Sequence, residues 1–283
     1  MSNQTKKETT VGTKIRHSLQ ADCQSCFGLC CTALNILASS DFAINKPAGT
    51  PCPNLQDNYS CHIHSQLRET GFKGCTVFDC LGAGQQVSQV TFHGQDWRQS
   101  REHADKMFHV FPIMEQLYEM IAYVAEALSY QVDNMLYEQL LAQLKHLQQI
   151  IAQDADTLLA LDMVASRMPI NALLLQTSEQ IRQHSVKGKA SRNLNQRGAD
   201  WMGKNLKGKD LRATDLRGYL IAANLQDANL QGVDFIGADL RDANLRGADL
   251  STSLFLTQMQ INAAQGDRST KLPSYIKRPA HWQ

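Results

Sequence analysis

The sequence predicts a multidomain chain in which a cysteine-rich domain, a helical bundle and a solenoid follow one another. Three observations carry this prediction. All eight cysteines fall between Cys23 and Cys80, apolar residues recur at helical spacing over residues 100–186, and a five-residue repeat begins at Ala199. At roughly 150 residues per domain, a chain of 283 residues has room for about two domains.

Residues 1–22 form a polar segment without the apolar stretch of a secretory signal. No run in the chain approaches the ~18 apolar residues of a membrane span. We therefore expect a cytoplasmic protein with no membrane partner. The 28 basic and 27 acidic residues give a net charge of +1, so the whole chain carries no charge excess that would favour a nucleic acid.

Residues 23–99 are predicted to form a metal-binding domain. Crowded thiols in a reducing compartment indicate shared metal ligands more often than disulfides or unrelated core thiols, which are the two alternatives. Two histidines lie among the cysteines, and imidazole binds the same metals as thiolate. The candidate ligands are Cys23, Cys26, Cys30, Cys31, Cys52, Cys61, Cys75, Cys80, His62 and His64.

The spacing Cys23-x2-Cys26-x3-Cys30-Cys31, followed by Cys61, Cys75 and Cys80, resembles the bacterial zinc- or iron-chelating family with a C-x2-C-x3-C-C signature. The resemblance implies a metal and no particular reaction. Eight thiolates could fill two tetrahedral zinc sites, or four could hold an iron–sulfur cluster. Adjacent Cys30 and Cys31 are expected to point apart and to serve different sites.

Other features of this zone admit two interpretations. The Gly82-Ala83-Gly84 segment is a G-x-G without a third glycine, which favours a tight turn over a phosphate cradle. His93, Asp96 and His103 are ordinary surface or core residues, or they are the catalytic candidates of an enzyme whose metal keeps one position open.

Residues 100–186 are predicted to form a bundle of four or five helices. Leu117, Met120, Ile121 and Val124 recur at helical spacing, and a second such series runs from Leu136 to Ile151. Asp133 and Asp154 are candidate N-caps, and Pro112 and Pro169 suit first turns. Residues 187–198 then read as a polar linker.

Residues 199–257 repeat with a period of five. A large apolar residue recurs in twelve units, from Trp201 through Leu225 and Leu240 to Phe255. A period of five would scatter these side chains around an α-helix and alternate them between the faces of a strand. Only a solenoid with a whole number of units per turn keeps all of them inside.

The A-(D/N)-L-x-x units resemble pentapeptide-repeat proteins. This resemblance implies a right-handed quadrilateral β-helix with four units per coil, and hence about three coils. The predicted fold class is therefore multidomain α+β. Two departures stand out: Lys204 and Lys209 occupy positions for small inward residues, and one residue is missing between Leu216 and Leu220. Residues 258–283 should cap one end, with a short helix over 258–264 and an extended strap.

The leading functional hypothesis is a noncatalytic adaptor that holds zinc or iron and binds a partner protein through its repeat surface. The alternative is a metal-dependent oxidoreductase or related enzyme with a small-molecule substrate. A third hypothesis, a DNA mimic that interacts with gyrase, comes from one branch of the pentapeptide family. Residues 187–250 contain 11 Lys and Arg against 8 Asp, whereas a DNA mimic should be acidic.

Overall fold

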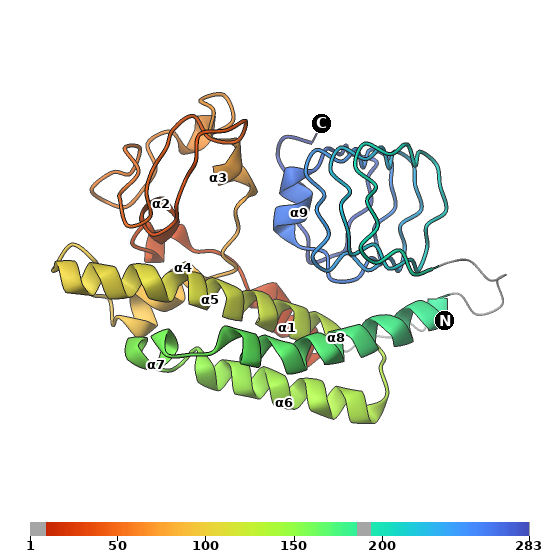
Figure 1. Ribbon diagram of the computed structural model, residues 1–283, viewed down its shortest axis with the longest axis horizontal. Helices are drawn as coiled ribbons and strands as arrows, with labels where there is room; N and C mark the ends of the chain where they lie inside the picture. Colours follow the sequence, from red (N-terminus) through yellow and green to blue (C-terminus); the bar gives the residue numbers. More distant parts are fainter. Residues whose placement is uncertain (1–9, 186–193, 283) are drawn as a thin grey trace, which may run out of the picture. The chain divides into compact units, whose positions relative to one another are not determined.

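The computed structural model describes residues 10–185 and 194–282 (Figure 1). These residues divide into two compact units, which are described separately. The first unit contains the residues up to 66 and residues 80–174; the second contains 67–79 and the residues from 175 onward. Most of the predicted polar linker, residues 187–193, lies outside the described residues.

The cysteine segment of the first unit contains short helical turns joined by loops. They are η1 (Cys23–Ser25), α2 (Leu29–Thr32), η2 (His64–Gln66), α4 (Ala83–Gln85) and the π-helix η3 (Gln86–Thr91). Lys46 organises the loops from inside. Its buried ammonium group donates hydrogen bonds to the carbonyls of Thr32 (3.1 Å), Leu34 (2.5 Å) and Thr50 (2.9 Å).

The remainder of the first unit is the predicted helical bundle. It consists of α1 (Val11–Ser18), α5 (Arg101–Ala127), α6 (Asn134–Ile150), α7 (Ala155–Leu159) and the first half of α8 (Met163–Ser185). The caps Asp133 and Asp154 are confirmed, because each carboxylate accepts a hydrogen bond from a backbone N–H three residues on, at 2.9 and 2.8 Å.

The expectation that Pro112 and Pro169 begin helices is wrong, since both lie inside longer helices. α5 starts earlier because the Ser100 hydroxyl accepts from the backbone N–H of His103 at 3.1 Å. α8 starts earlier because the Asp162 carboxylate accepts from the N–H groups of Val164 and Ala165. A side-chain cap upstream thus fixes the start of each helix.

Helix α1 lies in the segment that was expected only to be polar. Its Gly12 contacts α5 so closely that a Cβ there would come within 2.2 Å of the Ala125 carbonyl oxygen. One turn later, Arg16 and Glu126 form a buried ion pair with 4.0 Å between Nε and Oε2. One glycine and one arginine on an otherwise polar helix give too little apolar periodicity to reveal the packing from sequence.

The second unit is a stack of coils built from the five-residue repeat. Single residues pair with residues 19 to 22 positions further on, through isolated parallel bridges that form four columns. One column joins Asn205, Asn224 and Asn244, whose side-chain amides also donate to one another along the stack at 3.2 and 3.3 Å. The predicted inward ladder is confirmed: Leu225, Leu230, Leu240 and Leu245 are at most 1% exposed.

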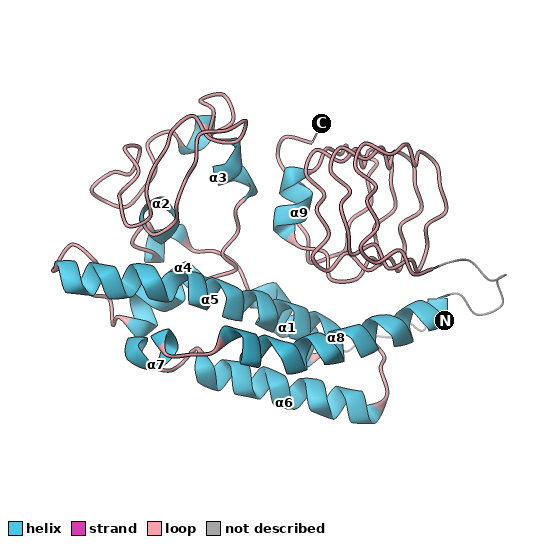
Figure 2. Ribbon diagram, viewed as in Figure 1, coloured by secondary structure: helices cyan, strands magenta, loops and turns pink. Residues whose placement is uncertain are grey.

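The predicted fold class, multidomain α+β with a right-handed quadrilateral β-helix, is wrong. Figure 2 draws helices and loops throughout residues 10–185 and 194–282, and no strand or sheet occurs there. The reason is local. Each unit has a single extended residue before the chain turns, so pairing between coils is limited to one residue at a time and never reaches the length of a strand.

The Asp or Asn of each unit makes these turns. Its side-chain oxygen accepts a hydrogen bond from the backbone N–H two residues on, as in Asn224 with Gln226 (3.2 Å) and Asp239 with Arg241 (3.1 Å). Such Asx turns satisfy a backbone donor at each corner. Some of these acidic residues also pair with a basic side chain, as Asp239 does with Arg241 at 2.6 Å.

The residue missing between Leu216 and Leu220 shortens one side of the first complete coil. Bridges that span it join residues 19 apart, whereas later ones join residues 20 to 22 apart. Gly218 lies on this short side, and a Cβ there would come within 2.4 Å of the carbonyl oxygen of Ala199. Only glycine lets the two coils approach so closely.

The tail caps the far end of the stack, as predicted. α9 (Gln258–Ala263) begins with a capping box formed by Thr257 and Gln260. Ile261 joins the coil core, and the Trp282 indole N–H donates to the Ala264 carbonyl at 3.1 Å. The apolar end of the last coil is therefore covered by the chain itself.

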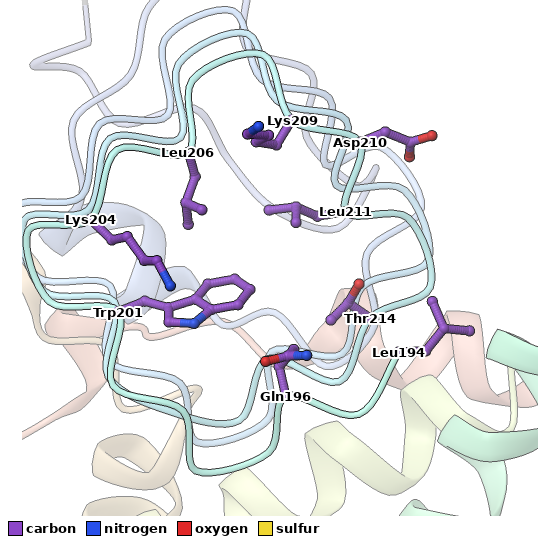
Figure 3. Close-up of a pocket in the computed structure, with 9 residues that line it drawn as sticks. All are labelled: Leu194, Gln196, Trp201, Lys204, Leu206, Lys209, Asp210, Leu211 and Thr214. Atoms are coloured by element: carbon purple, nitrogen blue, oxygen red, sulfur yellow. The ribbon is translucent and has the colours of Figure 1, made fainter. Parts of the chain in front are cut away.

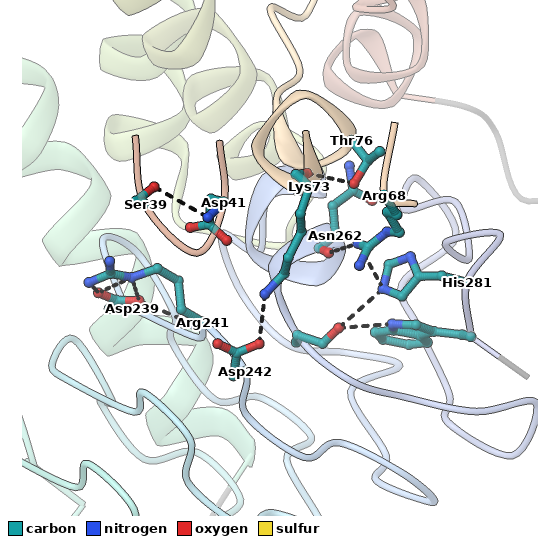
Figure 4. Close-up of polar contacts among 12 residues, drawn as sticks. Ser39, Asp41, Arg68, Lys73, Thr76, Asp239, Arg241, Asp242, Asn262 and His281 are labelled. Atoms are coloured by element: carbon teal, nitrogen blue, oxygen red, sulfur yellow. Dashed lines mark hydrogen bonds and ion pairs between the residues drawn. The ribbon is translucent and has the colours of Figure 1, made fainter. Parts of the chain in front are cut away.

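Residues 67–79, with helix α3 (Lys73–Val77), pack on this cap (Figure 4). Arg68 donates to the Asn262 carbonyl and contacts the His281 ring nitrogen Nε2, each at 3.2 Å. Lys73 pairs with Asp242 at 2.8 Å. A segment that lies between two cysteine loops in the sequence thus belongs structurally to the C-terminal repeats.

None of the described helices combines the length and the apolar character that crossing a bilayer requires.

Candidate metal centre

The first unit brings seven of the eight cysteines into one loop region. η1 carries Cys23 and ends at Cys26, and a left-handed Gly28 then starts α2, which carries Cys30 and Cys31. The backbone N–H of Cys52 donates to the Cys31 carbonyl at 2.9 Å. Cys61 pairs with Leu55 in an antiparallel bridge. Cys75, the eighth, lies on α3 in the second unit.

Cys30 and Cys31 are the central pair of this region. Their sulfurs are 3.9 Å apart, so the expectation that they point apart is wrong. Both side chains leave a single helical turn that follows the left-handed Gly28, and the turn directs them to the same side. Two thiolates bound to one tetrahedral zinc ion at 2.3 Å would be separated by about this distance.

Neighbouring thiols shift one another's pKa. The pKa of Cys30 is well above its ordinary value, first because the thiol donates a hydrogen bond to Cys31, then because it is buried and close to the charges of Cys31, Cys26 and Cys23. The pKa of Cys31 is lowered by the same hydrogen bond, and the ammonium group of Lys46 lowers it further.

The outer thiols extend this chain of neighbours. Burial is the main cause that raises the pKa of Cys26, and the charge of Cys80 adds to it. Burial also raises the pKa of Cys61, where Cys31 and Cys52 contribute. The seven thiols therefore form one electrostatically connected group in which each senses at least one other.

Gly84 was not recognised from the sequence as part of this region. It lies in α4 at ordinary helical φ, and a Cβ on it would meet the sulfur of Cys26 at 2.7 Å and that of Cys80 at 3.7 Å. The two sulfurs therefore occupy the space that a side chain would fill. The G-x-G segment was the available signal, and its interpretation as a tight turn rather than a phosphate cradle agrees with the left-handed Gly82 that starts α4.

The predicted histidine and aspartate residues make ordinary contacts. His62 Nδ1 is 3.2 Å from the Asn54 carbonyl, and His103 Nε2 is 3.3 Å from the Gln95 carbonyl. Asp96 accepts from the backbone N–H of Arg98 at 2.6 Å. His64 and His93 are exposed, and His93 has a left-handed backbone.

Within residues 10–185 and 194–282, no three His, Cys, Asp or Glu side chains stand in a preformed metal-binding group. The eight cysteines are present there as thiols without a disulfide between any two of them. The assignment of Cys23, Cys26, Cys30, Cys31, Cys52, Cys61, Cys75, Cys80, His62 and His64 to a metal thus stays a prediction, as does the catalytic assignment of His93, Asp96 and His103.

Comparison with known proteins addresses the repeat directly. The family model described as Pentapeptide repeats matches residues 219–255 in eight copies. A Bacillus subtilis (strain 168) protein, printed as "Uncharacterized protein YybG", is 54% identical over 277 residues, which cover 98% of this chain and 99% of the relative. This chain belongs to the YybG family. No solved structure matches it.

The eight matched copies in this YybG-family chain are the units centred on Leu220 to Phe255. The first four predicted units, from Trp201 to Leu216, lie outside the match. They contain Lys204 and Lys209 and end at the missing residue, so the departures seen in the sequence coincide with the limit of the regular family pattern. The resemblance of the cysteine segment to the C-x2-C-x3-C-C family stays a prediction.

Proposed function

We propose that this pentapeptide-repeat protein binds zinc or iron through its connected thiol group and acts as an interaction adaptor rather than as an enzyme. The observation that carries the metal is that seven thiols lie in the loops of the first unit, with the sulfurs of Cys30 and Cys31 3.9 Å apart and those of Cys26 and Cys80 beside Gly84. Protonated thiols gain no stability from lying close together. A bound cation, by contrast, stabilises several thiolates at once.

The thiols need not be preformed into a metal shell. Ligand side chains of small metal domains commonly settle into place when the metal binds, because binding and folding are coupled. The chain's own contribution is a frame of turns, with Lys46 holding the loop carbonyls and Gly84 leaving room for Cys26 and Cys80. The metal would supply cross-linking of loops that have few regular elements.

The adaptor role is inferred from the repeat coil. Its apolar residues are turned inward, and Asx turns hold the outward side chains of successive units at fixed spacing. Such a lateral surface suits a partner protein. A noncatalytic role is further supported by the ordinary contacts of His62 and His103, which direct those rings to backbone carbonyls.

Metal analysis and absorption spectroscopy of anaerobically purified protein test this proposal. We expect at least one zinc or iron per chain, and a lower metal content in Cys26→Ser. Ser25→Ala is the matched control, because it alters the neighbouring residue without removing a thiol. Gly84→Ala should also lower metal content, since its methyl group would displace the sulfur of Cys26.

Metal-free protein with an intact, protease-resistant first unit would contradict the metal proposal.

His62→Ala and His103→Ala separate the adaptor from the enzyme hypothesis. Unchanged metal content and spectrum are expected for both. A changed spectrum in either variant, together with a spectrum that responds to a small molecule, would instead support an open catalytic site.

A further inference from the structure

The first coil of the repeat stack leaves a hollow of about 250 Å³ that is open to solvent. Trp201, Leu206 and Leu211 form its apolar surface, and Lys204 and Lys209 also line it (Figure 3). Nothing in the metal or adaptor proposal uses this hollow. It lies wholly within the second unit.

The two lysines reach the hollow because of their place in the repeat. The backbone pairs the carbonyls of Lys204 and Lys209 with the N–H groups of Asn224 and Asn229, so the lysines stack on Ala223 and Ala228 of the next coil. Those alanines are buried, as the interior requires. In the first coil the same inward position opens toward solvent, and a long charged side chain is tolerated there.

The charge in the hollow is unbalanced. Lys204 Nζ lies 5.3 Å from the centroid of the Trp201 ring, and within residues 194–282 neither lysine forms an ion pair. Asp210 also lines the hollow, but both of its carboxylate oxygens are engaged by Arg212, at 2.8 and 2.6 Å. Two ammonium groups thus face an apolar surface without a carboxylate of their own.

The apolar surface and the two lysines together indicate which kind of ligand fits the hollow. Leu206 is 7% exposed, and Trp201 and Leu211 pack against the coil core, so the hollow favours a flat apolar body. The lysines favour an anionic group on that body. The volume is slightly below the ~300 Å³ lower limit of usual small-molecule pockets, which restricts the ligand to about one ring. We propose that the hollow binds a small aromatic carboxylate.

Calorimetric titration of the full chain with benzoate tests the proposal, with benzyl alcohol and inorganic phosphate as the two comparison probes. We expect saturable binding of benzoate and far weaker binding of the other two. Lys204→Gln and Lys209→Gln should each weaken benzoate binding about tenfold or more, because each removes a charge-assisted hydrogen bond. Lys207→Gln, which changes a lysine of the same coil that does not line the hollow, should leave binding unchanged.

Three results would overturn the proposal: no saturable binding of benzoate, equal weakening by Lys207→Gln, or phosphate binding as tight as benzoate, which would mean surface charge alone. Thermal unfolding of each variant checks that the coil stays folded. The double variant Lys204→Gln/Lys209→Gln gives an alternative outcome. If it self-associates and the parent protein does not bind benzoate, the lysines instead prevent the open coil ends of two molecules from pairing.

Discussion

At most corners of the repeat coil the backbone is left-handed two residues after the inward side chain. Gly203, Gly208 and Gly237 take this conformation without a side chain, but Ala222 (φ 55°) and Asp227 (φ 57°) take it with one. An L-residue with a Cβ is strained in this region by about 1–2 kcal/mol. The choice of residue at each corner therefore adjusts stability without changing any contact in the core.

Gly237→Ala is expected to lower the free energy of unfolding by about 1 kcal/mol, for backbone reasons alone. Its φ is +67°, and nothing lies within 4 Å of the position that a Cβ would take. Ala222→Gly is the matched reverse change and should be neutral or stabilising. Chemical denaturation of both variants measures the effect, and a stabilising Gly237→Ala would contradict the assignment of the corner.

Asp267 predicts a pH dependence in the capping segment. Its pKa is lowered to about 2, chiefly by the hydrogen bond from the Ser269 hydroxyl, with further backbone N–H donors at Gly247, Thr270 and Ser269. A carboxyl with a lowered folded-state pKa contributes stability above its unfolded-state pKa near 4 and loses it as the pH falls toward 2.

The difference in unfolding free energy between the parent protein and Asp267→Asn should therefore be largest above pH 4 and should shrink between pH 4 and pH 2. Denaturation series at several pH values measure this difference. A difference that is constant over that range would show that the carboxylate charge is not what the N–H donors stabilise.

The end of helix α8 is fixed by a buried polar network on the repeat coil, inside the second unit. The Ser178 hydroxyl donates to the Asp234 carboxylate at 2.5 Å and accepts from Arg182 Nε at 3.0 Å. Arg217 lies within ion-pair distance of both Asp234 (2.8 Å) and Asp215 (3.1 Å). Its N–H groups do not point at the oxygens in hydrogen-bond geometry, so Ser178 is the better-aligned donor to Asp234.

Ser178→Ala should lower the free energy of unfolding of the second unit by about 1–3 kcal/mol, because it leaves a buried carboxylate oxygen without its donor. Burial already raises the pKa of Asp234, and Ser178 opposes that rise. Ser185→Ala, on the exposed end of the same helix, is the control and should have little effect. Equal effects of the two substitutions would mean that the network adds no specific stability.

The sequence predicts best those elements in which the spacing of apolar residues is regular over several turns or repeat units. The inward ladder from Leu225 to Leu250, the caps at Asp133 and Asp154 and the covering tail all follow from spacing and side-chain chemistry. Asp234 could not be distinguished from the other Asx positions, since the same residue type is half-exposed at Asp239. Its burial depends on α8, which lies about fifty residues earlier in the chain.

The candidate metal centre was predicted in its composition but not in its arrangement. The cysteines were named from spacing, yet the close approach of Cys30 and Cys31 and the role of Gly84 depend on turns that carry no periodic signal. That residues 67–79 belong to the second unit could not be predicted either, because their contacts with Asn262 and Asp242 join positions 194 and 169 residues apart.

The division into two units predicts how the molecule responds to loss of the proposed metal. The loops of the first unit have few regular elements, whereas the repeat coil has a continuous apolar core of its own. A chelator added anaerobically should therefore increase amide hydrogen exchange in residues 23–61 and 80–91 while Leu225 to Leu250 stay protected. Comparing holo and chelated protein by hydrogen exchange and mass spectrometry measures this directly.

The segment that carries Cys75 makes the same experiment informative about the ligand set. Lys73 and Arg68 anchor this segment to the repeat cap without any metal, so contacts with the cap alone would keep residues 67–79 protected after chelation. Faster exchange there, matched by lower metal content in Cys75→Ser, would make Cys75 a ligand. Equal loss of protection in residues 23–61 and in the ladder from Leu225 to Leu250 would contradict the prediction, because the coil has an apolar core of its own.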